Sequence, residues 1–243
     1  MKILVLQHER VEHPAAFRWL IEAAGHSWHP VHLNEGEPVP PVSDLDAYGA
    51  LWVMGGPMDV WEEDQYSWLA PEKAFVKTAI DGGMPFFGLC FGHQILAEAM
   101  GGKCAPGTAE VGVMEVALTE DGVRSGFLEG MPQTLTTLQW HGAEVADPPP
   151  GATILASSPA CAVQAMSVGP TAFSAQFHLE VEADTVDNWA AIPAYEAALV
   201  KSFGPGGVAT LRADCAAHMS GFEASARQVW RNWCAAAGLA AGA

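Results

Sequence analysis

The chain has 243 residues and a formal net charge of −17, from 28 acidic and 11 basic residues. So acidic a composition provides no broad cationic surface for a phosphate backbone or an anionic leaflet, and we expect neither nucleic acid nor a membrane as partner. No run of about 18 apolar residues occurs, and the N-terminus MKILVLQHER has too short an apolar stretch for a signal peptide. We therefore expect a cytoplasmic protein.

The cysteines give a second constraint on the class of protein. They are odd in number, widely scattered and without a C-x-x-C pair: Cys90, Cys104, Cys161, Cys215 and Cys234. This pattern argues against a disulfide framework and against a zinc knuckle. We expect reduced thiols, no bound metal and no cofactor.

The first half of the chain alternates β-prone runs with helical patterns. The predicted elements are a strand over 3–6, a helix over 14–24, a strand over 50–54, a helix over 71–80, a strand over 85–89 and a helix over 91–100. Such alternation predicts an α/β fold with a mostly parallel central sheet, helices on both faces and flavodoxin-like layering.

The second half changes character. Residues 111–177 read as short strands with turns at Asp121-Gly122, at 148–151 and at Gly169-Pro170, which predicts a β-rich half. Beyond Glu180 the chain is Ala-rich and helical, with a break at 204–207.

The last helix carries Trp230 and Trp233, three residues apart and hence on one face. We predict that this pair packs the helix onto the core. With no long linker present, the expected organisation is one domain over 1–190 and a C-terminal helical extension over 191–243, packed on the same core.

The segment Gly88-Leu89-Cys90-Phe91-Gly92 sets a cysteine between a predicted strand and a predicted helix. This has the form of a nucleophile elbow, in which a sharp turn brings the flanking glycines into close approach. The turn exposes the side chain at the carboxyl end of the strand, and the helix N-terminus favours thiolate. Cys90 is thus either a reactive thiol or, because free cysteines are often buried, a core residue. The other four cysteines lack this context.

A thiol nucleophile needs a base, and the base needs a partner that fixes its tautomer. Residues 174–181, SAQFHLEV, alternate like a strand, which puts His178 and Glu180 on one face. In isolation the pair also fits an exposed polar strand face. Together with the elbow it favours a Cys90, His178 and Glu180 site.

Acyl chemistry also needs donors for a developing oxyanion. The backbone N–H of Phe91, at the helix start, is one candidate. The turn Gly55-Gly56-Pro57 follows another predicted parallel strand, so Gly56 is the second candidate. The acidic, aromatic loop that follows, 58–69, either shapes the pocket mouth or is a solvated surface loop.

Four segments carry a family resemblance: GGPMDVWEEDQYSWL, GLCFGHQILAEAMGG, LQWHGAEV and AQFHLEV. Over roughly residues 45–182 they resemble class I, triad-type glutamine amidotransferases, in particular free-standing proteins similar to the glutaminase domain of GMP synthase. The resemblance implies Cys90 as nucleophile, His178 as acid/base and Glu180 as its orienting partner, with Gly56 and Phe91 as oxyanion donors. It also implies that Gln94, Trp140 and His141 line the substrate pocket.

Two departures bear on the substrate. The family's W-H-G-D pattern reads Trp140-His141-Gly142-Ala143, so any contact of that aspartate is missing. No synthetase domain follows, since the tail from about residue 192 is too short for one. The expected partners are therefore glutamine or another γ-glutamyl compound, and a separate synthetase subunit if ammonia is passed on.

Three alternatives stay open at this level. The first is a γ-glutamyl peptidase or amide hydrolase that acts without a synthetase. The second is a catalytically idle regulatory or binding protein, which an intact triad disfavours. The third, a DJ-1-like redox or chaperone protein, shares the elbow cysteine but does not predict F-H-x-E. Cysteine-dependent hydrolysis of a γ-glutamyl amide through a thioester on Cys90 is the leading prediction.

Overall fold

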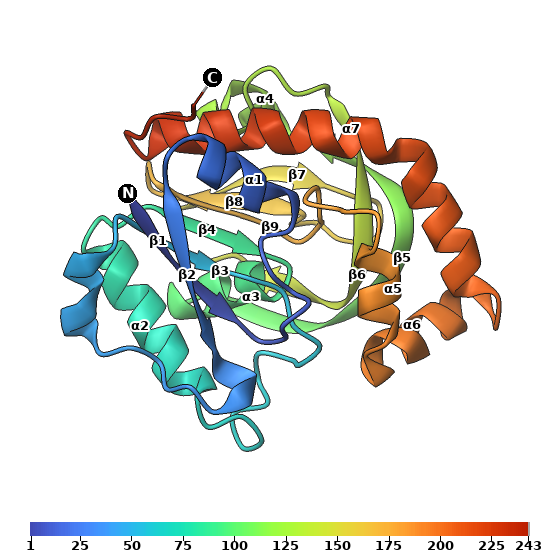
Figure 1. The fold of residues 1–243 in the computed structure, drawn as a ribbon, viewed down its shortest axis with the longest axis horizontal. Coiled ribbons are helices and arrows are strands. Elements are labelled where there is room, and N and C mark those ends of the chain that lie inside the picture. Colours follow the sequence, from blue (N-terminus) through green and yellow to red (C-terminus); the bar gives the residue numbers. More distant parts are fainter. Residues whose placement is uncertain (243) are drawn as a thin grey trace.

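A nine-stranded sheet in the order β2-β1-β3-β4-β9-β8-β7-β5-β6 runs through the computed structural model, which describes residues 1–242 (Figure 1). The strands are β1 (Lys2–Gln7), β2 (Ser27–His32), β3 (Ala50–Val53), β4 (Phe86–Leu89), β5 (Lys103–Leu118), β6 (Thr134–Asp147), β7 (Ala152–Ser157), β8 (Ala165–Val168) and β9 (Ala172–Ala175). The helices are α1 (Ala16–Ala23), α2 (Leu69–Asp81), α3 (Phe91–Ala99), α4 (Glu120–Arg124), α5 (Thr185–Ala190), α6 (Pro193–Phe203) and α7 (Gly207–Ala236). Three short 3₁₀ turns complete the list: η1 (Leu33–Glu35), η2 (Val42–Ala47) and η3 (Gly126–Leu128).

The sheet changes direction at β9. Strands β2, β1, β3, β4 and β9 are parallel neighbours, whereas β9, β8, β7, β5 and β6 pair antiparallel. The predicted α/β fold is confirmed, and the sheet is mixed because the β-rich second half joins the same sheet. The strands there are not all short. β5 and β6 span 16 and 14 residues and form a long antiparallel pair with two register shifts in β5.

Strand periodicity divides the apolar residues of the parallel strands between two of the three hydrophobic clusters. In β1, Ile3 and Val5 belong to one cluster and Leu4 and Leu6 to the other. The first cluster includes side chains of α1 and α7, and the second includes side chains of α2 and α3. The parallel strands are therefore covered on both faces, which explains their continuous apolar sequence. Figure 1 shows α1 and α7 on one side of these strands and α2 on the other.

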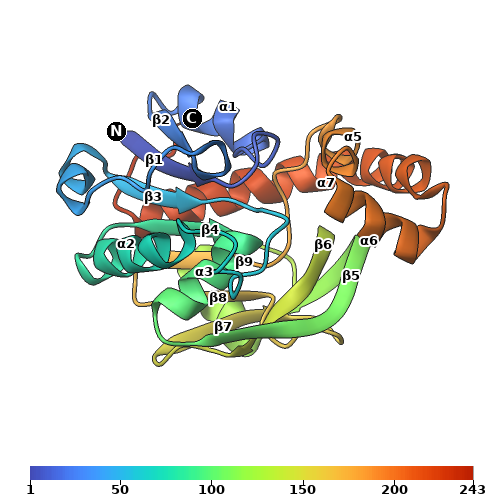
Figure 2. The ribbon, with the colours of Figure 1, turned by 90° about the horizontal axis from the view of Figure 1, so that it is seen from below.

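The α7 tryptophans pack as predicted. Trp230 and Trp233 are both buried, and their rings stack with centroids 5.8 Å apart. The Trp233 indole also donates a hydrogen bond to the Phe86 carbonyl at 3.1 Å, which ties α7 to β4. Helices α5 and α6 lie beside the β5–β6 pair at the other end of the molecule (Figure 2). The boundary between 1–190 and 191–243 stays a prediction.

Two local predictions differ from the structure. The expected turn at Asp121-Gly122 lies inside the short helix α4, because the Thr119 side chain caps it by accepting a hydrogen bond from the Gly122 N–H at 2.9 Å. Strand β2 is not predicted, since this edge strand buries only one of its residues, Val31, and lacks an apolar run. In the part of the chain that the structure describes, no helix is both long and apolar enough to cross a bilayer.

Candidate active site

Cys90 occupies a sharp turn between β4 and α3. Its backbone has φ 52° and ψ −103°, a strained conformation for a residue with a side chain. A Cβ on Gly88 would lie 2.5 Å from the Gly92 carbonyl oxygen, and a Cβ on Gly92 would lie 2.0 Å from the Val53 carbonyl oxygen. Both glycines are therefore required by close backbone approach, and the turn has the geometry of an elbow.

The predicted strand over 174–181 is wrong beyond its second residue. β9 ends at Ala175, and His178 forms only an isolated bridge to Leu138 of β6, with N···O distances of 2.9 and 3.1 Å. The chain leaves β9 here because the backbone of His178 pairs with β6. The predicted pairing of His178 and Glu180 is nevertheless present, since Nδ1 of His178 and Oε1 of Glu180 are 2.6 Å apart.

His178 lies close enough to the Cys90 sulfur for that sulfur to raise the pKa of its imidazole. Burial by itself lowers the pKa of His178, but the Glu180 carboxylate and the Cys90 sulfur outweigh burial and hold this pKa well above 6.5. Trp189 of α5 packs against the imidazole in a T-shaped arrangement, with ring centroids 4.5 Å apart. The three predicted catalytic residues therefore form one contiguous, buried group in which His178 favours the imidazolium form.

Both predicted oxyanion donors lie next to this group. Phe91 is the first residue of α3, so its N–H has no partner within the helix. Gly56 lines the same cavity as Cys90. A Cβ on Gly56 would lie 2.5 Å from Sδ of Met58 and 2.8 Å from Cβ of His8, so only glycine lets the backbone pass here.

A cavity of about 150 Å³ opens at the Cys90 sulfur. The predicted pocket residues Gln94, Trp140 and His141 all line it, and so does Ala143. Met58 and Asp59 also line it, so the beginning of the 58–69 loop shapes the pocket. Trp61, further along that loop, is 40% exposed.

Helix α6 supplies a wall of the cavity that no sequence motif indicates. Ala194, Tyr195 and Ala198 face the cavity. The Tyr195 carbonyl accepts a hydrogen bond from the Trp140 indole at 3.3 Å, and the Tyr195 hydroxyl donates to the buried carboxyl group of Glu12. Burial raises the pKa of Glu12. Residues from both ends of the chain thus meet at the pocket.

A chain of amides reaches the sulfur from the side of α3. The Gln94 side chain donates to the Gln176 amide oxygen at 3.1 Å, and the Gln176 NH₂ group lies 3.5 Å from Sγ of Cys90. An N–H aimed at sulfur stabilises the negative charge of a thiolate. Nothing in the sequence pattern singles out Gln176 beyond its place in AQFHLEV.

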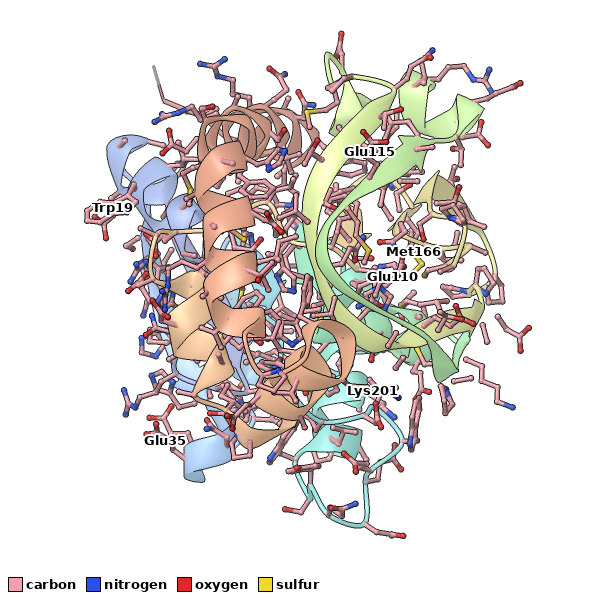
Figure 3. All side chains as sticks on the ribbon, turned by 90° about the vertical axis from the view of Figure 1, so that its right-hand side faces the viewer. Trp19, Glu35, Glu110, Glu115, Met166 and Lys201 are labelled. Carbon is pink, nitrogen blue, oxygen red and sulfur yellow. The ribbon has the colours of Figure 1, made fainter. Side chains whose placement is uncertain are left out.

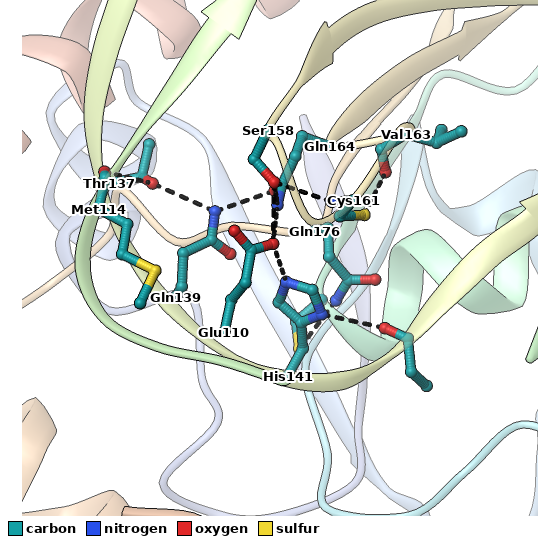
Figure 4. Close-up of polar contacts among 12 residues, drawn as sticks. Glu110, Met114, Thr137, Gln139, His141, Ser158, Cys161, Val163, Gln164 and Gln176 are labelled. Atoms are coloured by element: carbon teal, nitrogen blue, oxygen red, sulfur yellow. Dashed lines mark hydrogen bonds and ion pairs between the residues drawn. The ribbon is translucent and has the colours of Figure 1, made fainter. Parts of the chain in front are cut away.

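His141 also belongs to a polar network with Glu110, Ser158 and Gln164 (Figure 4). This network joins the amide chain at Gln176, whose backbone N–H donates to the Gln164 carbonyl at 2.8 Å. Nδ1 of His141 contacts the Ala143 carbonyl at 3.0 Å, and its Nε2 lies 3.2 Å from Oε2 of Glu110. Burial raises the pKa of Glu110, but contacts from His141, Ser158 and Gln164 outweigh burial and lower this pKa overall. Glu110 therefore remains ionised and fixes the His141 ring against the cavity.

A second hollow, of about 420 Å³, lies between α1 and α7 and is lined by Trp19, Leu20, Met219 and Arg227 among others. Trp19, at the edge of this hollow, is 65% exposed and projects outward (Figure 3). The same view shows Glu110 on the concave side of the curved β5–β6 pair, away from this hollow. None of the predicted site residues borders this second hollow. Within residues 1–242 no cluster of three or more His, Cys, Asp or Glu side chains is arranged to hold a metal ion.

Comparison with known proteins agrees with the fold. The model of the family "Glutamine amidotransferase class-I" matches residues 26–189, and the chain belongs to this family. The solved structure of a glutamine amidotransferase from Thermotoga maritima superposes with a TM-score of 0.84 at 25% identity, covering 96% of this chain and 97% of that one.

Three curated relatives differ in their named activities. The glutamine amidotransferase-like protein YfeJ of Salmonella typhimurium is 29% identical over 77% of this chain and 79% of its own length. A glutamine-hydrolysing GMP synthase subunit of Saccharolobus solfataricus is 33% identical, over 60% of this chain and 74% of its own. Gamma-glutamyl peptidase 3 of Arabidopsis thaliana is 29% identical over 64% of each chain. Against the GMP synthase of Neisseria gonorrhoeae, which is 30% identical over 58% of this chain, the match spans only 26% of that relative's length.

Proposed function

We propose that the protein is a cysteine-dependent glutaminase of the amidotransferase type, which hydrolyses glutamine or a related γ-glutamyl amide through a thioester on Cys90. The observation that carries the proposal is the contiguous group of Cys90 at a strained elbow, His178 beside its sulfur and Glu180 bonded to His178 at 2.6 Å. Family membership supports the same chemistry.

In the proposed reaction the Cys90 thiolate attacks the γ-carboxamide carbon, and the N–H groups of Gly56 and Phe91 stabilise the oxyanion. The C–N bond then breaks, ammonia leaves with a proton from the His178 imidazolium, and a γ-glutamyl thioester remains. His178 next takes a proton from water, which attacks the thioester carbon. The C–S bond breaks, glutamate is released and the Cys90 thiolate is restored. Glu180 holds the Nδ1 side of the imidazole throughout.

Trapping the acyl-enzyme tests the proposal. The purified chain is mixed with a panel of γ-glutamyl compounds, quenched in acid and weighed, and the adduct is located by peptide mapping. We expect a γ-glutamyl mass on Cys90 and none in Cys90→Ala. Cys161→Ser is the matched control, because Cys161 is also buried but has no elbow, and it should still form the adduct. Absence of any adduct and of any ammonia release would leave the idle binding protein as the better description.

A γ-glutamyl peptidase is the second candidate. Ala143 stands in the cavity wall where the family pattern has aspartate, so the wall lacks that carboxylate. The likeness to a relative named gamma-glutamyl peptidase supports this candidate further. Comparing glutamine, γ-glutamyl alkylamides and γ-glutamyl peptides as substrates of the purified chain separates the two. The peptidase would be favoured if the purified chain hydrolyses γ-glutamyl peptides rapidly but does not hydrolyse glutamine.

Whether a synthetase partner receives the ammonia is part of the proposal for glutamine. Free ammonia is mostly protonated at neutral pH and is then no nucleophile, so a transferase would need a docked acceptor protein. We propose that residues 191–243 act as an extension of the 1–190 domain, since α6 supplies Ala194, Tyr195 and Ala198 to the cavity. Turnover of glutamine by the chain alone at rates typical of enzymes, about 1–10³ per second, would favour a hydrolase without a partner.

A further inference from the structure

His8 follows β1 and lies beneath the Gly55-Gly56 turn, although no step of the proposed reaction uses it. Its side chain is completely buried. Nδ1 contacts the Gly55 carbonyl oxygen at 3.0 Å, and Nε2 contacts Oε1 of the equally buried Glu72 at 2.9 Å. A buried ion pair of this kind costs desolvation energy and needs good geometry to persist.

The orientation of the Gly55–Gly56 peptide plane depends on the contact between His8 and the Gly55 carbonyl oxygen. The described chain has no cis peptide, so the Gly55 C=O and the Gly56 N–H point in opposite directions from the same plane. A donor that holds the Gly55 oxygen on the side of His8 therefore turns the Gly56 N–H to the other side. Glycine has little torsional preference of its own, so Gly55 and Gly56 do not fix this plane by themselves.

The contact with Glu72 fixes the protonation state of the His8 ring. A carbonyl oxygen and a carboxylate both accept hydrogen bonds, so both ring nitrogens of His8 must carry protons to satisfy both partners. Burial lowers the pKa of His8, but Glu72, with smaller contributions from the Gly55 carbonyl and Glu12, outweighs burial and raises this pKa overall, which agrees with that protonation. Glu72 lies in the first turn of α2, where the helix dipole favours a carboxylate.

The His8 ring also touches the second oxyanion donor. It packs edge-on against the Phe91 ring with centroids 4.7 Å apart. A Cβ on Gly56 would lie 2.8 Å from Cβ of His8, so His8 is in contact with that residue as well. One side chain thus touches both residues whose N–H groups stabilise the oxyanion in the proposed reaction.

We infer that His8, held by Glu72, is a positioning residue that turns the Gly55–Gly56 peptide so that the Gly56 N–H faces the cavity. The inference rests on the proposed function, because it concerns the oxyanion of that reaction. Loss of one oxyanion donor costs roughly 100- to 1,000-fold in kcat. We expect about a 10- to 100-fold lower kcat for His8→Leu, with KM for the productive substrate nearly unchanged.

The test compares two reactions of Cys90. Alkylation by iodoacetamide displaces iodide from a CH₂ group and forms no oxyanion. Amide hydrolysis forms an oxyanion twice, once when the thioester forms and once when water attacks it. For His8→Leu we expect the alkylation rate of Cys90 to stay within about twofold of wild type while kcat falls. His8→Asn places an amide NH₂ near the Nδ1 position and should recover part of the lost kcat.

The control is a buried histidine outside the oxyanion turn. His93 is also fully buried, and its ring contacts Ser174 at 2.8 Å and the Val163 carbonyl at 3.1 Å. His93→Leu should lower the melting temperature as His8→Leu does, yet leave the ratio of hydrolysis to alkylation near wild type. The inference fails if wild type hydrolyses the substrate and His8→Leu matches it, or if both variants lose hydrolysis alike. A wild-type protein without hydrolysis would instead contradict the proposed function.

Discussion

The imidazole of His178 and the carboxylate of Glu180 lie 2.6 Å apart, Nδ1 to Oε1, although the two residues do not share a regular strand. Glu180 also accepts a hydrogen bond from the Leu179 N–H at 2.9 Å through its other oxygen. The carboxylate is therefore held by its own backbone while it orients the ring. Its role in the proposed reaction is to fix a tautomer, and it is not consumed.

Glu180→Ala should lower turnover strongly, but less than Cys90→Ala or His178→Ala. In a comparable triad, loss of the orienting carboxylate lowers kcat about 10⁴-fold. Steady-state hydrolysis by the three variants, measured on the same substrate, checks the order. Near-wild-type turnover in Glu180→Ala would remove Glu180 from the triad.

The pH dependence of stability should carry the signature of His178. Its pKa in the folded state is raised above 6.5, so the folded protein binds this proton more tightly than the unfolded chain does. The resulting stabilisation is fully present below 6.5 and is lost as pH rises through the folded pKa. Denaturant unfolding of wild type and Glu180→Gln should show a stability difference that is largest below pH 6.5 and shrinks as pH rises through the raised folded pKa of His178. A difference that grows with pH contradicts this assignment.

Cysteine labelling should be selective. Burial raises the pKa of Cys161 to about 11 and that of Cys215 and Cys234 to about 12. Burial also raises the pKa of Cys104. A diazo-ketone analogue of glutamine should therefore alkylate Cys90 first, because the thiolate is the nucleophile and Cys90 borders the cavity. Peptide mass mapping after limited labelling is the measurement, and modification spread over the other thiols with Cys90 spared would count against the nucleophile.

Gly92→Ala should destabilise the fold by about 3 kcal/mol or more, because the new Cβ would meet a backbone oxygen that cannot move freely. That oxygen, of Val53, would lie 2.0 Å away. The matched control is Gly221→Ala in the exposed middle of α7, where a Cβ meets nothing within 4 Å. It should stabilise by up to about 1 kcal/mol through helix propensity. The measurement is the free energy of unfolding of both variants in urea. Equal changes in this free energy for the two variants would argue against the tight elbow.

If the substrate is the proposed γ-glutamyl compound, Asp59 should recognise its α-ammonium group. Among the described residues, Asp59 is the one acidic side chain that lines the cavity. Asp59→Asn should raise KM about tenfold, or 1.4 kcal/mol, with little change in kcat. The control Asp64→Asn makes the same change in the same loop at an exposed position.

The same residue sets an expected pH effect on KM. Burial, and then the charge of Glu62, raise the pKa of Asp59. As pH falls through this raised pKa, Asp59 becomes neutral, so KM of the wild type should rise at a higher pH than an ordinary aspartate would give. In Asp59→Asn this part of the profile should be flat. A wild-type profile that matches the variant would exclude Asp59 from substrate recognition.

The elements that are predictable from sequence are those set by neighbours along the chain. The elbow follows from the two glycines around Cys90, and the packing of α7 follows from Trp230 and Trp233. His178 and Glu180 are predicted as a pair because they are close in sequence, but the strand supposed to hold them ends at Ala175, since His178 pairs with β6 instead.

The unpredicted parts of the site depend on contacts over long sequence distances. His8 and Glu72 are 64 residues apart, and Glu12 and Tyr195 are 183 apart. Neither pair has a local pattern, because the two partners lie far apart in the sequence and each alone is an ordinary polar residue. Only the folded sheet, which brings the end of β1 next to α2 and α6, makes these contacts. The switch from parallel to antiparallel pairing at β9 is likewise a property of the whole sheet.

Helix α6 begins at Pro193, beyond the stretch of 26–189 that defines the family, yet it provides part of the cavity wall. The proposed nucleophile and its proposed base come from β4, α3 and the segment after β9, which lie inside that stretch. The proposed chemistry at Cys90 thus lies inside the matched stretch, whereas the cavity wall draws both on that stretch, through Asp59 and Ala143, and on α6 beyond it. A change at Ala194 or Ala198 would therefore reshape the cavity without altering Cys90 or His178.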